Sequence, residues 1–436
     1  MSPSSKRTAS KAASSHSKTA RDSSRRLQAL SILLALLMIL ALVILYLYFE
    51  KNGWPSLQTS TTPQADIQTS EPGGEFTKTP RPTITPTPSG PEPTPIALNG
   101  SYKPLTWLTL YFTNPKDPNV TSNGIDQVVV AEIGNAKTSI DVASFDLNLP
   151  SISEALVSAQ KRGVIVRVVV DGVNGSTTLK ASDTADNKAY DALKAMKAAK
   201  IPVVNGGRSS GLMHDKLVII DSKVLYMGSW NLSYNDTFRN NNNLLRITNP
   251  VLISNYQAKF DEMFVTRKFG TRSKVGAKEP DFKIGTIRVQ NYFSPRDKVM
   301  EKLVGLVSGA KKSVHFYAFT YTHVDLSNAM IERAKAGVDV QGVIEDRGAS
   351  QGALPALFCA KLKVNTDGNK NTMHHKVIII DGEIVITGSF NFTQSADKSN
   401  DDNVLIIYSK SVANVYEDEF KRIMQESNTP DSVTCP

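Results

Sequence analysis

The chain contains one stretch twice, as MHDKLVIIDSKVLYMGSWN at residues 213–231 and as MHHKVIIIDGEIVITGSFN at residues 373–391. Two further segments repeat in the same order before it: LTLYFTNPKD (108–117) with VQNYFSPRDK (289–298), and AKTSIDVASFDL (136–147) with AKKSVHFYAFTY (310–321). Self-similarity of this kind indicates that two copies of one structural unit form the body of the chain.

Each copy alternates apolar strand segments with single helices. In the first copy, the predicted strands SIDVASFDL and VIVRVVVDG flank the helix ISEALVSAQKR; in the second, VHFYAF and VDVQGVIED flank LSNAMIERAKAG. This order implies parallel strands joined by crossover helices, with both faces of each sheet covered. We therefore predict an α/β fold of two sandwich repeats, at residues 101–270 and 280–428, related by a pseudo-twofold axis.

The repeated stretch carries polar residues at one fixed spacing. The pattern His, any residue, Lys, four residues, Asp, six residues, Gly-Ser, any residue, Asn comprises His214, Lys216, Asp221, Gly228, Ser229 and Asn231 in the first copy, and His374, Lys376, Asp381, Gly388, Ser389 and Asn391 in the second. Residues i and i+2 of a strand share a face, so the histidine and lysine of each copy point the same way.

A hairpin is expected to follow each of these strands. Asp381-Gly382 favours a type I′ turn, which returns the Gly-Ser-x-Asn segment alongside the histidine. Gly228 and Gly388 lack a Cβ atom, so the backbone there could come close to a bound group.

These residue types suit the chemistry of a phosphodiester. Such a substrate is anionic and resists attack, so its catalyst needs hydrogen-bond donors for the non-bridging oxygens, a nucleophile, and an acid for the leaving alcohol. Two lysines and two asparagines can supply the donors, and two histidines can supply the rest. Because neither copy suffices alone, the strand ends of the two copies should face each other.

The paired motif resembles the double HKD signature of the phospholipase D superfamily at all twelve positions, and the resemblance extends over about residues 105–425. It implies a two-step reaction that needs no metal or other cofactor. One histidine attacks phosphorus to give a phosphohistidine; the other protonates the leaving alcohol and then activates water. The resemblance makes His214 the nucleophile and His374 the acid and base, and it makes Asp221 and Asp381 structural.

The resemblance also implies an acid about 28 residues after each histidine that orients its ring. That position is Asp402 in the second copy and Asn242 in the first. An asparagine supports a cationic ring less than a carboxylate does, so we expect the two histidines to differ. The candidate catalytic residues are thus His214, Lys216, Asn231, His374, Lys376 and Asn391, supported by Ser229, Ser389, Gly228, Gly388, Asn242 and Asp402.

Other residues of suggestive type have simpler interpretations. His315 and His323 lack the motif, and His375 lies on the opposite strand face, so we expect ordinary core or surface roles. Trp230 and Phe390 could line a substrate cleft, but strand aromatics more often serve packing.

The N-terminal hundred residues differ from the rest in composition. Residues 29–49 are an uninterrupted apolar run, long enough as a helix to cross a hydrocarbon core. Residues 1–28 form a basic tail, and residues 50–100 are a Pro/Thr/Ser-rich linker that cannot bury enough apolar surface to fold. We predict a single-pass membrane protein with a cytoplasmic N-terminus and an extracytoplasmic catalytic domain, because basic flanks stay inside.

Charge and cysteine content limit the alternatives only weakly. The formal net charge is +9, but residues 1–26 contribute +6 of it. The charge that remains on the rest of the chain therefore does not by itself predict a broad nucleic-acid-binding face on the repeats. The only two cysteines, Cys359 and Cys435, lie in the exported part. A disulfide between them and a pair of free thiols are both compatible with the sequence, and their spacing does not resemble a zinc site.

Three functions remain open from the sequence. The membrane segment favours a phospholipase D that releases phosphatidic acid from phospholipids. The YFTNP and YFSPR openings and the short copies resemble the compact nuclease branch of the superfamily, so nucleic acid is the alternative substrate. A non-catalytic surface binding protein is the third, although no histidine or lysine of the signature is lost. Because the two copies complement each other, we expect a monomeric active unit.

Overall fold

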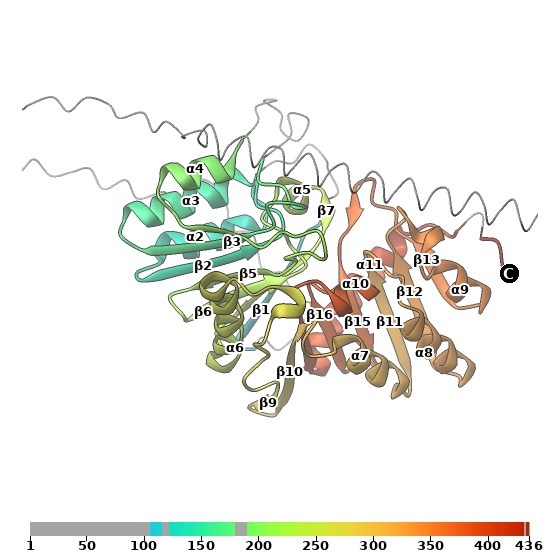
Figure 1. The fold of residues 1–436 in the computed structure, drawn as a ribbon. Coiled ribbons are helices and arrows are strands. Elements are labelled where there is room, and N and C mark those ends of the chain that lie inside the picture. Colours follow the sequence, from blue (N-terminus) through green and yellow to red (C-terminus); the bar gives the residue numbers. More distant parts are fainter. Residues whose placement is uncertain (1–104, 116–121, 179–189, 431–432, 436) are drawn as a thin grey trace, which may run out of the picture. The chain divides into compact units, whose positions relative to one another are not determined.

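The computed structural model describes residues 105–115, 122–178, 190–430 and 433–435 (Figure 1). The expected basic tail (1–28), transmembrane segment (29–49) and linker (50–100) lie outside the described residues. Of the helices in the described part of the chain, none is long and apolar enough to cross a membrane.

The first half is built on a seven-stranded sheet with the order β1-β8-β6-β5-β2-β3-β4. Its strands are β1 (Leu108–Phe112), β2 (Ser139–Ser144), β3 (Ile165–Val170), β4 (Val203–Asn205), β5 (Lys216–Ile220), β6 (Val224–Gly228) and β8 (Asn243–Ile247). Its helices are α2 (Asp126–Asn135), α3 (Pro150–Lys161), α4 (Ala192–Ala198), α5 (Tyr234–Phe238) and α6 (Pro250–Asp261), and α6 continues into η2 (Glu262–Thr266) and is followed by η3 (Gly270–Arg272). Strands β2, β3 and β4 run parallel, and the others pair antiparallel.

The second half contains an eight-stranded sheet with the order β13-β12-β11-β15-β16-β17-β10-β9. Its strands are β9 (Asp281–Ile284), β10 (Ile287–Ser294), β11 (Ser313–Ala318), β12 (Asp339–Ile344), β13 (Lys363–Thr366), β15 (Lys376–Ile380), β16 (Ile384–Gly388) and β17 (Asp402–Tyr408). Its helices are α7 (Val299–Ser308), α8 (Val324–Lys335), η4 (Ala349–Gln351), α9 (Leu354–Cys359), α10 (Gln394–Lys398) and α11 (Lys410–Glu426). Read from the β9 edge, the strand order of this sheet matches that of the first sheet position by position, with β9 as one additional strand. The expected mixed α/β architecture is confirmed.

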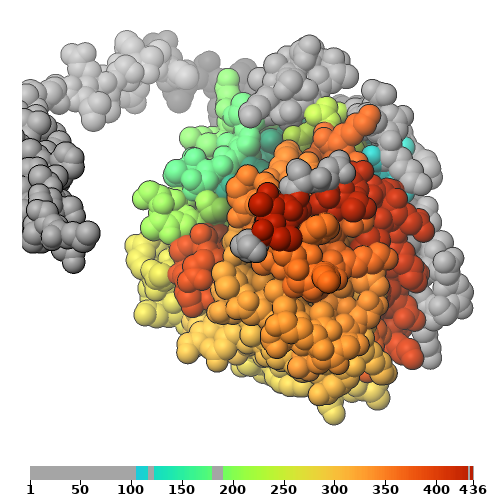
Figure 2. Space-filling view, turned by 90° about the vertical axis from the view of Figure 1, so that its right-hand side faces the viewer, coloured from blue at the N-terminus to red at the C-terminus, as the bar shows by residue number. Residues whose placement is uncertain are grey.

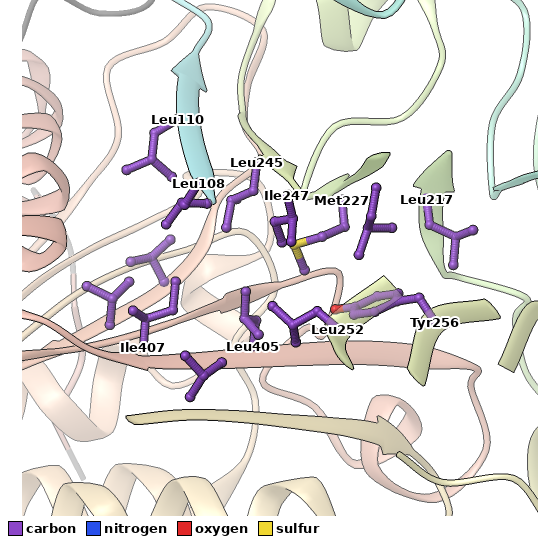
Figure 3. Packing of buried hydrophobic residues seen from close by; sticks show 14 of the residues in the cluster. Leu108, Leu110, Leu217, Met227, Leu245, Ile247, Leu252, Tyr256, Leu405 and Ile407 are labelled. Atoms are coloured by element: carbon purple, nitrogen blue, oxygen red, sulfur yellow. The ribbon is translucent and has the colours of Figure 1, made fainter. Parts of the chain in front are cut away.

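Each sheet is apolar on both faces. Helices α2, α3 and α4 cover one face of the first sheet, and α7, α8 and α9 cover the matching face of the second (Figure 1). The remaining faces belong to one shared core, in which Leu217 and Leu245 of the first sheet join Leu405 and Ile407 of the second, with Tyr256 of α6 among them (Figure 3). Strands buried on both sides need near-continuous Val, Ile and Leu, as LVII and VIII provide.

Strands β5 and β15 begin at the signature lysines, so His214 and His374 lie just before a strand and not on it as expected, but the hairpins that follow have the expected turn. Asp381 and Gly382 have φ values of 55° and 63°, and Asp221 of the first copy also lies in the left-handed region with φ 52°. Positive φ at both central positions is the mark of a type I′ turn. The carboxylate of Asp381 accepts hydrogen bonds from the backbone N–H groups of residues 311–313, and Asp221 binds residues 137–139 in the same way. Both side chains therefore anchor the hairpin tip to the segment that precedes the neighbouring strand.

The C-terminal segment is tied back to the second half. Cys359, the last residue of α9, forms a disulfide with Cys435, which settles the alternative that the sequence left open. Thr366 and Asn428 exchange two backbone hydrogen bonds on the same side. In Figure 2 the dark red C-terminal segment lies on the orange surface of this half.

Candidate active site

The two signature motifs meet because each histidine segment pairs with the opposite half. The N–H group of His214 donates to the carbonyl oxygen of Asp401, and that of His374 donates to Asn241, both at 2.9 Å. The short strands β7 (Asn240–Asn241) and β14 (Thr372–Met373) pair in parallel, and an isolated bridge joins Met213 to Asp401 in the same manner. These crossed backbone contacts bring both motifs into one site.

The ring of His214 is oriented by a carboxylate of the second half. Its Nδ1 lies 2.7 Å from Oδ1 of Asp402, and both side chains are buried. A carboxylate is an acceptor only, so Nδ1 must carry the hydrogen and Nε2 keeps its lone pair. The same oxygen of Asp402 accepts a hydrogen bond from Oγ of Ser389 at 2.6 Å. Ser389 therefore positions the orienting carboxylate.

The ring of His374 is oriented by an amide of the first half. Its Nδ1 lies 3.0 Å from Oδ1 of Asn242 and 3.4 Å from Oδ2 of Asp236. The amide of Asn242 has a defined orientation, because Oδ1 accepts from Oγ of Ser229 at 2.8 Å and Nδ2 donates to the carbonyl oxygen of Asp236 at 3.0 Å. His374 is thus also an Nδ1–H tautomer with Nε2 as the acceptor.

This exchange corrects one expectation from the sequence. Asp402 was expected to orient His374 and Asn242 to orient His214, each within its own copy, and both assignments were wrong. The carboxylate acts on His214 and the amide on His374. The physical reason is the crossed pairing, in which the start of β17 lies beside the first histidine and the start of β8 beside the second. The expected inequality of the two rings remains, with its direction reversed.

Both signature lysines are buried beside the histidines. Nζ of Lys216 donates to the carbonyl oxygen of His214 at 2.9 Å, and Nζ of Lys376 donates to that of His374 at 2.5 Å. Burial lowers the pKa of Lys216, and burial together with the charge of Lys216 holds the pKa of Lys376 well below its usual value. Two buried lysines, of which one lowers the pKa of the other, favour binding of an anion beside them.

The same forces act on the histidines. Burial and then the charge of Lys216 lower the pKa of His214, while burial, Lys376 and Lys216 hold the pKa of His374 well below its usual range. Both rings are therefore neutral near pH 7 before an anion binds. An anionic phosphodiester would offset the lysine charges and allow one ring to hold a proton.

Two phenylalanines that were not expected at the site pack against the histidine rings. The ring of Phe145 packs edge-on against His214 at 5.3 Å between centroids, and Phe319 packs against His374 at 4.7 Å. Nζ of Lys376 also lies 4.6 Å from the centroid of the Phe319 ring. A signal was present, because both phenylalanines occupy the same position of the repeated segments 136–147 and 310–321.

The asparagines and glycines of the signature have separate roles. Oδ1 of Asn391 is buried and has no hydrogen-bond partner in the described part of the chain, which is unusual for a buried polar atom. Gly228 and Gly388 were expected to admit a bound group, and the structure gives another cause. A Cβ atom on Gly388 would come within 2.3 Å of the carbonyl oxygen of Asn403, and one on Gly228 within 2.4 Å of that of Asn243. The glycines thus allow close approach of the neighbouring strand.

The remaining candidates are structural. Trp230 and Phe390 are almost fully buried in the helix-covered cores, which confirms packing over cleft lining. His375 points away from the signature lysine and pairs with Glu419 of α11 at 3.1 Å. Within the described ranges, no group of three or more His, Cys, Asp or Glu side chains is placed to hold a metal ion.

Comparison with known proteins gives consistent matches. The family model "Cardiolipin synthase, PLD-like domain" matches residues 129–264 and 303–424. The mitochondrial cardiolipin hydrolase of Xenopus tropicalis is 31% identical over 132 residues, which are 30% of this chain and 63% of that protein. The phospholipase D of Rickettsia bellii (strain RML369-C) is 33% identical over 131 residues, 30% of this chain and 65% of that protein. The chain therefore spans just under two thirds of the length of these curated relatives.

A solved structure shares the fold over most of the chain. The phosphatidylserine synthase of Haemophilus influenzae Rd KW20 aligns with a TM-score of 0.57, covering 74% of this chain and 88% of that chain at 13% identity. At this identity the likeness concerns the fold alone.

Proposed function

Because the chain belongs to the phospholipase D superfamily, we propose that it hydrolyses phosphodiesters through a phosphohistidine on His214, with His374 as acid and base. One observation carries the proposal. Both rings are held as Nδ1–H tautomers by acceptors from the opposite half, and in the described part of the chain no hydrogen bond engages either Nε2. Two such nitrogens beside two buried lysines are what a double-displacement reaction at phosphorus requires.

In the first step, Nε2 of His214 forms a bond to phosphorus and the bond from phosphorus to the leaving alcohol breaks. His374, protonated once the anionic substrate is bound, gives its Nε2 proton to the departing oxygen. Lys216 and Lys376 donate to the non-bridging oxygens, where charge accumulates. The phosphorylated ring is cationic, and the carboxylate of Asp402 compensates that charge. This compensation is the reason to place the nucleophile at His214.

In the second step, the now neutral His374 removes a proton from water as the water oxygen attacks phosphorus. The bond between phosphorus and Nε2 of His214 breaks, and the ring returns to its neutral form. The enzyme is regenerated, with the proton on His374 ready for the next leaving group. Neither step calls for a metal or another cofactor.

We infer a phospholipid as the substrate and phosphatidic acid as the product. The curated relatives named phospholipase D and mitochondrial cardiolipin hydrolase support this choice. The apolar run of residues 29–49 supports it as well, since a single-pass anchor with an extracytoplasmic catalytic domain would hold the site near lipid head groups. The active unit is one chain, because both histidines and both orienting groups come from it.

The proposal is tested with the full-length chain in phosphatidylcholine vesicles, by measuring choline and phosphatidic acid with and without a chelator. Single-stranded DNA is the parallel substrate. We expect chelator-resistant lipid hydrolysis that is lost in both His214→Ala and His374→Ala, with thermal unfolding unchanged. With the phosphatidyl ester of p-nitrophenol, whose leaving group needs no proton, the His374→Ala variant should accumulate phosphoenzyme, and the His214→Ala variant should form none.

Other outcomes contradict defined parts of the proposal. Full activity of both variants removes the two-histidine mechanism, and loss of activity to chelator removes the metal-free reaction. Cleavage of DNA without lipid hydrolysis assigns the chain to the nuclease alternative. Binding of either substrate without turnover indicates a non-catalytic binding protein.

A further inference from the structure

We propose that Asp236 is a positioning residue for His374, and that it supplies from helix α5 the negative charge that Asn242 does not provide. The inference rests on the proposed function, because it concerns the acid and base of that reaction. Asp236 is outside the signature, and its own copy of the repeat offered no reason to select it.

Comparison of the two copies shows a compensating exchange. Asp236 lies five residues after Asn231 of the first signature, and the position five residues after Asn391 is Ala396. The two backbones correspond, because the hydroxyl of the preceding N-cap residue, Ser233 or Thr393, accepts the N–H of Asp236 or Ala396. Thus the first copy, which has Asn242 at the orienting position, carries the added carboxylate of Asp236. The second copy, which has Asp402 at the orienting position, carries Ala396 in place of that added carboxylate.

The carboxylate of Asp236 is buried and directed at the ring. Oδ2 lies 3.4 Å from Nδ1 of His374 and accepts the N–H of Asn231 at 2.8 Å, while Oδ1 accepts Nδ2 of Asn240 at 2.5 Å. The carbonyl oxygen of Asp236 also holds Nδ2 of Asn242. The residue therefore fixes both the amide orientation and the charge on the Nδ1 side of the ring.

The charge matters because the other groups around His374 mostly oppose a proton on it. The titratable and charged groups around His374 are Lys376 of β15, Lys216 of β5, the rings of His214 and His375, and the carboxylates of Asp236, Asp402 and Glu345. Of the carboxylates in the described part of the chain, Asp236 is the one that lies within 4 Å of the His374 ring. An opposite charge at this range shifts a buried pKa by about one unit or more. Asp236 thereby allows His374 to hold the proton that the leaving alcohol needs.

The test compares full-length wild-type enzyme with Asp236→Asn on two substrates, phosphatidylcholine and the phosphatidyl ester of p-nitrophenol. The asparagine keeps an acceptor for Asn231 but loses the charge. The kcat for phosphatidylcholine falls as pH rises through the pKa of His374 in the complex, so Asp236→Asn should move this limb to lower pH by about one unit. At neutral pH we expect roughly tenfold loss on phosphatidylcholine. Phosphoenzyme formation from the p-nitrophenyl ester should change little, because that leaving group needs no proton.

Asp397→Asn is the matched control. Asp397 is a buried carboxylate on the equivalent helix α10, where it accepts the N–H of Met300. We expect its replacement to affect stability and leave the pH limb in place. The Asp236→Asn/Asn242→Asp double variant returns a carboxylate to the ring and should restore the limb.

A wild-type pH limb in the Asp236→Asn enzyme, with equal effects on both substrates, overturns the inference. Should that variant fail to fold, Asp236→Ala decides by the same two measurements, because alanine is the residue at the equivalent position of α10. If the wild-type chain hydrolyses no diester, the proposed function fails; if it does and depends on His374, only the role of Asp236 is in question.

Discussion

Replacing Asp402 by asparagine separates charge from shape at the ring of His214. Oδ1 of Asp402 receives two hydrogen bonds, from Nδ1 of His214 at 2.7 Å and from Oγ of Ser389 at 2.6 Å. Both donors demand an acceptor, so the oxygen of the asparagine must occupy this place. Its amide group then takes the place of Oδ2, which is buried and unpartnered within the described residues. We therefore expect Asp402→Asn to retain the ring geometry while adding an unpaired buried donor.

The expected magnitudes follow from these contacts. A hydrogen bond to a charged partner contributes about 1.5–3 kcal/mol and a neutral one about 1 kcal/mol, so the phosphorylation step should lose about 1.5 kcal/mol, or roughly tenfold in rate. The unpaired amide should lower the free energy of unfolding by about 1–3 kcal/mol. Asp402 raises the pKa of His214 against the effect of burial, so its replacement lowers that pKa further. A neutral ring then persists to lower pH, and the acidic limb of the rate profile shifts downward.

The assay is rapid-quench measurement of phosphoenzyme formation on the full-length chain, between pH 5 and 9, beside chemical denaturation. Asp397→Asn serves again as the buried carboxylate outside the site. A phosphorylation rate within twofold of wild type, with the acidic limb unmoved, would refute the assignment of Asp402 to His214. A defect confined to water attack would place the nucleophile on the other ring.

Gly388→Ala should unfold at a lower denaturant concentration and lose activity, because its Cβ would clash with the carbonyl oxygen of Asn403 on the paired strand. The Cβ of Gly382→Ala meets no atom within 4 Å, so this variant should be destabilised only by the strain of its positive φ. Denaturation midpoints and turnover rates of both variants check this. Reduction of the Cys359–Cys435 disulfide, or replacement of both residues by serine, should lower the free energy of unfolding by about 4 kcal/mol, because the bond closes a loop with a separation of 76 residues. The kcat should stay unchanged. Equal denaturation midpoints for the oxidised and reduced protein would contradict this. Burial raises the pKa of Asp221 but backbone N–H groups lower it to about 2, so this carboxylate stabilises the fold above about pH 4 and the contribution is lost as pH falls toward 2. Asp221→Asn should thus cost about 1 kcal/mol at pH 7 after allowance for its exposure, and only a small part of that near pH 2, as measured by denaturation at both pH values.

Much of the fold and of the site follows from local patterns. The strand that begins at Lys216, the turn at Asp381 and the burial of Trp230 depend on residues near each other in the chain, where strand period and turn chemistry are sufficient. The repetition of these patterns was enough to expect two facing motifs.

The sequence could not assign partners across the halves. Asp402 follows His374 at the family spacing, so counting along the chain joins the wrong pair; only the crossing of the strand ends shows that it binds His214. Asp236 escaped notice for a related reason, because its target lies 138 residues away and its equivalent in the other copy is alanine. The disulfide depends likewise on where the last residues of the chain return.

The exchange of orienting groups between the halves also bears on how such a chain can diverge. In a symmetric pair of identical single-copy subunits, one residue type must occupy the orienting position at both rings, so any replacement alters both at once. Joining two copies in one polypeptide removes that coupling. A change at position 242 then reaches only His374, and a change at position 402 only His214. Two copies joined in one polypeptide thus permit a division of labour between the two histidines.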